Sequence, residues 1–287
     1  MPDATLPFAL TRPAHVSQAH LVVSDLDMVS AFYRSMIGLG TLDKSESGEV
    51  LGIDGVPLLS LTTRGDAVRA PRTAAGLFHT AFLVPDRTAL AAWLAHYSQA
   101  GLRLEGASDH LVSEALYLSD PEGNGIEIYR DRQPEEWTTF TDGTVEMATH
   151  RLDLQALYDS AARKPWTGMQ SGTAVGHIHL QVGDLPAAEA FYRDVLGLKV
   201  MARYSGASFF GAGGYHHHVA ANIWNSRGAP LRSEAMTGLA DYTLHFNDKA
   251  ALDQAVDALD RLEIVTSRTE AGLRFRDPSG IGLTLTM

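Results

Sequence analysis

Two distant segments of this chain repeat one pattern with every spacing kept. The first reads QAHLVVSDL at residues 18–26, with AFYR at 31–34 and GL at 38–39. The second reads HIHLQVGDL at 177–185, with AFYR at 190–193 and GL at 197–198. A weaker pair, DPEGNGIE at 120–127 and DPSGIGLT at 277–284, also keeps its spacing. Each half of the chain therefore holds two kinds of unit, A and then B, and this repeat constrains the fold.

All four units share one predicted order of elements. A short β-branched strand is followed by a stretch with apolar residues three and four apart, which predicts a helix, and then by short strands separated by Gly, Asp, Asn or Pro turns. Gly101 and Gly197 stand where a helix C-terminal cap belongs. We expect four βαβββ modules, numbered 1 to 4, at residues 16–62, 77–130, 175–225 and 240–287. The expected domains are residues 1–135, a connector at 136–172 with one helix around 152–162, and residues 173–287.

Composition narrows the classes of partner. The formal charge of −11 disfavours nucleic acid or an anionic membrane, because both select a basic surface. The chain has no cysteine, so disulfides, thiolate metal sites and a cysteine nucleophile are excluded. No apolar run approaches membrane-spanning length, and residues 1–15 do not resemble a signal peptide. We expect a cytoplasmic protein without nucleic-acid or membrane partners; the sequence allows a homo-oligomer.

The repeated motifs resemble those of the vicinal oxygen chelate superfamily, which includes glyoxalase I, bleomycin-binding proteins and extradiol dioxygenases. The segments HLVSEALYLSDPEGNGIE (110–127) and GGYHHHVAANIW (213–224) are most similar to two-domain catechol 2,3-dioxygenases. The resemblance covers nearly the whole chain. It implies an α+β fold in which the four βαβββ modules pair into two cupped, incomplete barrels. It also implies a metal inside a cup, held by residues from the first and last strands of the modules.

The register of the repeat selects candidate metal ligands. The first-strand position, seven residues before the aspartate that follows the strand, holds Gln18, His79, His177 and Asp241 in the four modules. The corresponding last-strand position holds Glu127 in module 2 and Thr284 in module 4. If modules 2 and 3 pair, His79, His177 and Glu127 form a two-histidine, one-carboxylate set of the kind that binds non-haem Fe(II). We expect this pairing; if modules pair 1 with 2 and 3 with 4 instead, the best set is Gln18, His79 and Glu127.

The resemblance also implies roles for three further residues. His218 corresponds to an acid/base histidine on the last strand of an A unit, with His217 as the alternative. His110 and Tyr117 correspond to a histidine and a tyrosine that precede the ligand glutamate, and they are expected to orient substrate and donate a hydrogen bond. The alternation of side chains along a strand places His216 and His218 on one face and His217 on the other. We therefore expect catalysis from His218, His110 and Tyr117.

These residues together predict an extradiol dioxygenase that opens a small aromatic diol with O2. Fe(II) is the expected cofactor, although Mn(II) or another divalent metal fits the same ligands. A glyoxalase-type metal-dependent isomerase or lyase is the first alternative, but such enzymes use two carboxylates. A non-catalytic, bleomycin-resistance-like binding protein is the second, and it needs an aromatic cleft without a metal triad. The pattern does not specify which catechol is opened.

Overall fold

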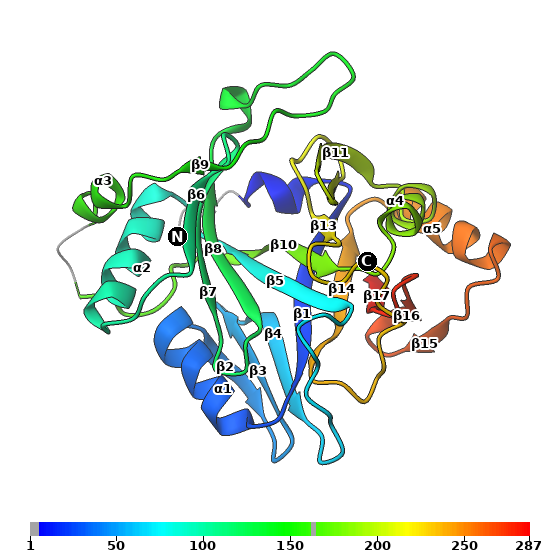
Figure 1. The fold of residues 1–287 in the computed structure, drawn as a ribbon, viewed down its shortest axis with the longest axis horizontal. Coiled ribbons are helices and arrows are strands. Elements are labelled where there is room, and N and C mark those ends of the chain that lie inside the picture. Colours follow the sequence, from blue (N-terminus) through cyan, green and yellow to red (C-terminus); the bar gives the residue numbers. More distant parts are fainter. Residues whose placement is uncertain (1–5, 162–164) are drawn as a thin grey trace.

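Four copies of one unit, a strand followed by a helix and three more strands, make up most of the chain (Figure 1). Module 1 comprises β1 (Ala14–Val23), α1 (Leu26–Phe32), β2 (Gly40–Lys44), β3 (Gly48–Ile53) and β4 (Val56–Thr63). Module 2 comprises β5 (Gly76–Leu83), α2 (Arg87–Gln99), β6 (Gly106–Asp109), β7 (Ser113–Ser119) and β8 (Gly125–Asp131). Module 3 comprises β10 (Ala174–Gln181), α4 (Leu185–Asp194), β11 (Lys199–Tyr204), β12 (Ala207–Gly211) and β13 (Val219–Asn222). Module 4 comprises β14 (Gly238–Phe246), α5 (Lys249–Arg261), β15 (Ser267–Thr269), β16 (Gly272–Arg276) and β17 (Gly282–Thr286).

The computed structural model describes residues 6–161 and 165–287, and within them the four predicted modules are confirmed. The segment between modules 2 and 3 contains η3 (Pro134–Glu136), β9 (His150–Arg151) and α3 (Leu154–Asp159). Two further short helical segments are η1 (Phe8–Thr11), before β1, and η2 (Tyr33–Ile37), after α1. The helix expected around 152–162 corresponds to α3; residue 162 lies outside the described residues.

The modules pair in a nested order. Modules 1 and 4 form an eight-stranded sheet in the described chain, the 1–4 sheet, with the order β15-β16-β17-β14-β1-β4-β3-β2. Modules 2 and 3 form a nine-stranded sheet with β9, the 2–3 sheet, with the order β11-β12-β13-β10-β5-β8-β7-β6-β9. In each sheet the first strands of the two modules lie antiparallel at the centre, β1 beside β14 and β5 beside β10. Each sheet therefore takes one module from each half of the sequence, so the expected domain boundaries do not coincide with the sheets.

An aspartate begins the helix of every module, which explains why this residue recurs in the repeat. The side chains of Asp25, Asp86, Asp184 and Asp248 each occupy the N-cap and accept a backbone N–H two or three positions later. Such a cap stabilises a helix by about 1 kcal/mol. Because the candidate ligand position lies seven residues before this aspartate, the cap also ties the helix start to the register of the first strand.

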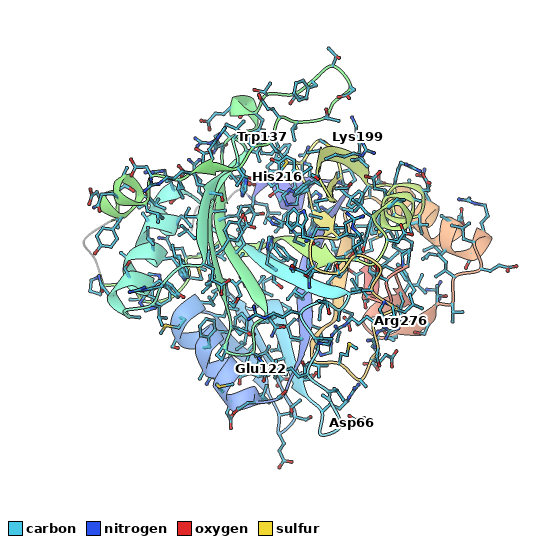
Figure 2. The ribbon with its side chains drawn as sticks, in the orientation of Figure 1. Asp66, Glu122, Trp137, Lys199, His216 and Arg276 are labelled. Carbon is cyan, nitrogen blue, oxygen red and sulfur yellow. The ribbon has the colours of Figure 1, made fainter. Side chains whose placement is uncertain are left out.

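Strand β10 lies at the centre of the packed interior. All eight of its residues are buried, because β10 packs against β1 of the 1–4 sheet and also lines a cavity. The apolar cluster around it includes residues from both sheets and from the helices at the sides of the molecule (Figures 1 and 2). The two AFYR segments contribute fully buried tyrosines, Tyr33 and Tyr192. Within the described ranges, no helix combines the length and the apolar character needed to cross a membrane.

Candidate metal centre

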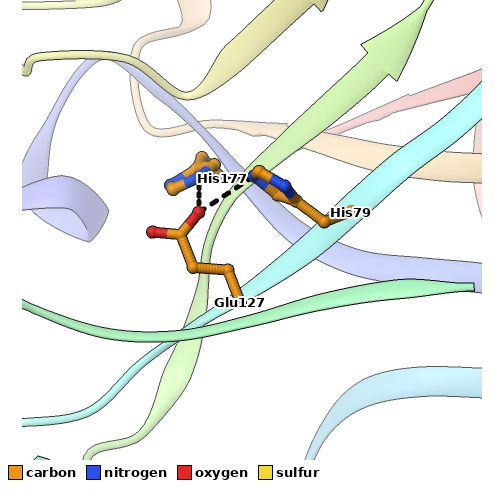
Figure 3. A group of neighbouring side chains, drawn as sticks. All are labelled: His79, Glu127 and His177. Carbon is orange, nitrogen blue, oxygen red and sulfur yellow. Dashed lines mark hydrogen bonds and ion pairs between the residues drawn. The ribbon is translucent and has the colours of Figure 1, made fainter. Parts of the chain in front are cut away.

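Three adjacent strands of the 2–3 sheet each supply one ligand-type side chain (Figure 3). His79 lies on β5, Glu127 on β8 and His177 on β10, and β5 is the middle strand. Both His177 and Glu127 are register partners of Ala81 on β5, so His177, Ala81 and Glu127 form a row across the sheet. Residues two apart on a strand share a face, which places His79 beside this row. The small side chain of Ala81 leaves room between its two neighbours.

The ligand atoms of these residues converge on one point. The Nε2 atom of His79 lies 2.9 Å from Oε2 of Glu127, and Nε2 of His177 lies 3.3 Å from the same oxygen. The two Nε2 atoms are 3.4 Å apart. All three residues are buried, with exposed fractions of 6%, 3% and 3% for His79, Glu127 and His177. This convergence follows from the pairing of modules 2 and 3, which the register of the repeat favoured.

The protonation states in this cluster suit a cation. Burial opposes ionisation of Glu127, but the hydrogen bonds and charge of His177 and His79 outweigh it and hold the pKa of the carboxyl well below its usual value. Burial lowers the pKa of His177 to about 4 despite the attraction of Glu127. The result is a carboxylate and a neutral imidazole, which are the forms that bind metals.

The spacing of the three atoms also fits a metal ion. Ligand bonds of about 2.1 Å place neighbouring ligand atoms about 3.0 Å apart at right angles and about 3.4 Å apart at tetrahedral angles. The observed separations span 2.9 to 3.4 Å. One feature differs from most metal sites, in which the second ring nitrogen of a ligand histidine is hydrogen-bonded. The Nδ1 atom of His177 is buried and has no such partner among the described residues.

These three residues line a cavity of about 920 Å³. Its wall also contains the expected His110 and Tyr117, together with His217 and Trp224. Several lining residues were not singled out as functional from the sequence; they include Phe78, Tyr204 and Phe209. Their aromatic rings, with that of Trp224, give the cavity flat apolar walls beside the ligand cluster.

His110 and Tyr117 form a pair whose hydrogen-bond directions are determined. Nδ1 of His110 lies 2.7 Å from the carbonyl oxygen of Ala148, which can only accept, so Nδ1 carries the proton. When the ring is neutral, Nε2 is an acceptor, and the hydroxyl of Tyr117 donates to it at 2.7 Å. Burial and the neighbouring charge of Glu127 raise the pKa of Tyr117 well above its usual value, which keeps this hydroxyl protonated.

His179 also lines the cavity, and its contact with Asn222 determines which ring nitrogen carries the proton. The backbone N–H of Trp224 donates to Oδ1 of Asn222, so the amide nitrogen of Asn222 is the atom that faces His179. That nitrogen donates to Nε2 of His179 at 3.0 Å. A neutral His179 therefore carries its proton on Nδ1. Burial lowers its pKa well below the usual value, so the ring stays neutral.

The expected acid/base residue His218 is not in the cavity wall. Its Nδ1 accepts the backbone N–H of Ala212 at 3.2 Å, and its Nε2 donates to the carbonyl oxygen of Ala9 at 3.0 Å. The residue that lines the cavity is His217, whose ring stacks on His177 with a centroid separation of 4.1 Å. The alternation argument failed because residues 212–218 form a loop between β12 and β13 and not a regular strand.

The equivalent positions of the 1–4 sheet hold no comparable cluster. Gln18 donates to the hydroxyl of Ser60, which lies on the neighbouring strand. Asp241 pairs with His20 and Arg274. In the described part of the chain, His79, Glu127 and His177 are the one group of three ligand-type side chains close enough to share an ion. The alternative set containing Gln18 is therefore wrong, because Gln18 belongs to the other sheet.

The comparisons with known proteins agree with this fold. The family model described as the Glyoxalase/Bleomycin resistance protein/Dioxygenase superfamily matches residues 12–128 and 174–285. A protein of Bacillus subtilis (strain 168) named catechol-2,3-dioxygenase is 39% identical over 284 residues, which cover 97% of this chain and 99% of the relative.

Solved structures show the same architecture at lower identity. A protein of Bacillus subtilis subsp. subtilis str. 168 superposes with a TM-score of 0.64 at 14% identity, covering 95% of this chain and 84% of that one. Glyoxalase I from Zea mays superposes with a TM-score of 0.57 at 16% identity, covering 97% and 94%. At such identities the likeness concerns the fold alone. With both sequence halves matched by the family model and both sheets built from its modules, the chain belongs to the glyoxalase/bleomycin resistance protein/dioxygenase superfamily.

Proposed function

We propose that this protein is an extradiol dioxygenase, which cleaves the ring of a catechol beside the two hydroxyl groups. The observation that carries the proposal is the buried group of two histidines and one glutamate at the wall of a cavity. Such a facial set is typical of non-haem Fe(II) oxygenases. The 39% identity to a protein named catechol-2,3-dioxygenase over nearly the whole chain supports the same activity.

In this proposal His79, Glu127 and His177 hold a divalent metal, with Fe(II) as the first choice. When bound, ferrous iron would supply a redox-active Lewis acid that lowers the pKa of the diol and activates O2. The protein contributes one negative charge and two neutral nitrogens. The walls of the cavity hold the ring next to the cluster, which replaces an encounter in solution with a fixed geometry.

Tyr117 and His110 act on a substrate oxygen. The hydroxyl hydrogen of Tyr117 is directed at His110, so its oxygen is free to accept a hydrogen bond from a catechol hydroxyl. A proton received there has a path: Tyr117 passes its own proton to Nε2 of His110. The Nδ1–H of His110 remains bonded to the carbonyl of Ala148, which stabilises the imidazolium. This pair thus orients the substrate and shares its proton.

His217 takes the acid/base role first expected of His218. It lines the cavity next to the ligand His177, whereas both ring nitrogens of His218 are bonded to backbone groups. Burial lowers the pKa of His217 well below its usual value, which keeps the ring in the neutral form that can accept a proton. His217 would accept a proton from the bound diol and return it later in the reaction.

The cavity suits a flat ring better than the substrates of an isomerase with two metal-bound carboxylates. Phe78, Phe209 and Trp224 line it, and only one carboxylate belongs to the ligand group. A glyoxalase-type activity would need a second carboxylate near the cluster. The maize glyoxalase likeness concerns the fold and gives no argument for that reaction.

Turnover by the iron-loaded protein tests the proposal. The protein is loaded with Fe(II) without oxygen, its metal content is measured, and catechol and substituted catechols are added in air. We expect O2 uptake and a yellow ring-opened semialdehyde in equal amounts, and loss of both in Glu127→Gln. If protein with one bound iron consumes no oxygen across the whole set of catechols, the proposal fails. Methylglyoxal with a thiol cofactor, assayed in parallel, tests the isomerase alternative.

A further inference from the structure

A line of hydrogen bonds leads away from the cavity through His217. Its Nδ1 lies 2.9 Å from Nδ1 of His216. Nε2 of His216 lies 2.8 Å from Oδ1 of Asp131, the last residue of β8, four positions after Glu127. The other carboxylate oxygen of Asp131 accepts the hydroxyl of Tyr215 at 3.0 Å. None of Asp131, Tyr215 or His216 lines the cavity, whereas His217 does.

When His216 is neutral, the chemistry of the partners sets the direction of every bond in this line. A carboxylate only accepts, so the proton between Asp131 and His216 is on Nε2 of His216. A neutral His216 then has a lone pair on Nδ1, and His217 must donate its Nδ1–H to it. That leaves Nε2 of His217 without a proton. Within the described residues Nε2 has no hydrogen-bond partner, and His217 faces the cavity.

We propose that Asp131 and His216 are positioning residues that hold His217 in the Nδ1–H form, so that its Nε2 lone pair is presented to the substrate. This assignment rests on the proposed function for its catalytic consequence. In the opposite form, Nε2 would carry a proton and could not accept one from a bound diol. Two neighbouring residues thus have different roles. His217 contacts the substrate, and His216 determines the tautomer of His217.

The surroundings of His216 are suited to positioning. Its side chain is fully buried, and its ring lies against Tyr215 with centroids 4.0 Å apart and near Trp137 at 5.3 Å (Figure 2). Tyr129 extends the network, because its hydroxyl donates to that of Tyr215 at 2.8 Å. With aromatic rings on its faces and hydrogen bonds at both nitrogens, the imidazole of His216 has no room to turn over.

Packing explains why this network tolerates no extra bulk. A Cβ atom at Gly176 would lie 1.8 Å from the hydroxyl oxygen of Tyr129. Glycine at this position of β10 therefore allows Tyr129 to reach Tyr215, and through it Asp131. The close approach is next to His177, so the metal cluster and the positioning line share one strand.

The tautomer of His217 can be determined by NMR without an activity assay. In protein labelled with ¹⁵N-histidine and loaded with Zn(II), which stays diamagnetic, two-bond ¹⁵N–¹H correlations distinguish Nδ1–H from Nε2–H rings. The spectrum of His217→Asn assigns the signal. We expect wild-type His217 to be in the Nδ1–H form; an Nε2–H ring overturns the proposal whether or not the protein is a dioxygenase.

A matched pair of variants tests the dependence on His216. His216→Asn keeps an acceptor at the position of Nδ1, whereas His216→Leu has nearly the same shape and no acceptor. We expect His216→Leu to give a mixture of His217 forms and a kcat about 10- to 100-fold lower with KM changed less than about 3-fold. His216→Asn should keep most of the wild-type kcat and most of the Nδ1–H form of His217. Equal kcat values and unchanged His217 signals in the two variants would overturn the proposal.

Tyr215→Phe serves as the control for packing. It removes one hydrogen bond from Asp131 but leaves the bond between Asp131 and His216, so the His217 signal should stay in the Nδ1–H form. If His216→Leu does not fold, Asp131→Leu removes the acceptor one step farther away and is expected to give the same mixture. Absence of catechol turnover with an Nδ1–H signal would reject the proposed function while leaving the assignment of His217 intact.

Discussion

The Nε2 atoms of His79 and His177 lie 3.4 Å apart although 98 residues separate them in the sequence. Their contact requires β5 and β10 to be neighbours at the centre of one sheet, which joins modules from different halves of the chain. Glu127 completes the group from the strand on the other side of β5. The metal proposal thus depends on a long-range pairing that single-residue changes can probe.

Glu127→Gln is expected to lower affinity for divalent metal by at least about 100-fold, because it removes the one negative charge of the cluster. Isothermal titration with Fe(II) or Mn(II) under nitrogen measures the change. Asp241→Asn alters the equivalent first-strand position in module 4 and should leave affinity within about 2-fold. Equal affinities for the two variants would contradict the site.

Ala81→Leu is expected to block metal binding without removing any ligand. Ala81 is a register partner of both His177 and Glu127 and is completely buried, so added carbons would enter the space between the two side chains. Overpacking of this kind costs about 1–3 kcal/mol of stability. Metal content after dialysis and thermal unfolding measure the two effects. A folded Ala81→Leu protein that binds metal as the wild type does would show that this space is not needed.

His217→Asn and His218→Asn are expected to fail in different ways. The first should lower kcat by about 100-fold or more, as loss of a general acid/base does. The second should keep kcat but reduce the free energy of unfolding by about 1–3 kcal/mol, because buried bonds to Ala9 and Ala212 are lost. Steady-state O2 uptake and urea unfolding separate the two effects. The reverse pattern would restore the role first assigned to His218.

His15 should make the 1–4 sheet sensitive to acid. Burial, with a contribution from the nearby His245, lowers the pKa of His15 to about 4 from 6.5. Between these values the unfolded chain binds more protons than the folded one, so stability falls as pH decreases from 6.5 toward 4. A shift of this size corresponds to about 3 kcal/mol at most. Urea unfolding of wild type and His15→Asn at pH 7 and 4.5 should show a smaller loss in the variant; parallel losses would exclude His15 as a cause.

Much of the fold followed from the sequence because the repeat is regular. The aspartates that cap the helices recur at one spacing from the first strands, so His79 and His177 could be placed at equivalent positions without coordinates. The pairing of modules 2 and 3 followed from chemistry, since it alone combined two histidines with Glu127.

The residues that contact the substrate or the metal ligands, but do not bind the metal, were harder to predict. His217 and His218 differ by one residue, and a loop does not keep the alternation that a strand imposes. No sequence pattern indicated a role for Asp131. Its partner His216 is far away in sequence, and the two residues come together only when modules 2 and 3 pair. Register predicts residues on regular strands, and it does not predict contacts made by loops.

Because the modules pair in a nested order, the two sheets can be completed at different times during synthesis. Modules 2 and 3 are adjacent in sequence, so their sheet can close once residue 222 has been synthesised, whereas β1 gains its central partner only when β14 is made. Contacts between distant segments form slowly, because loop closure must come first. During synthesis the group of metal ligands can therefore form while module 1 still has an open central edge, and such an unpaired edge is exposed to wrong pairing.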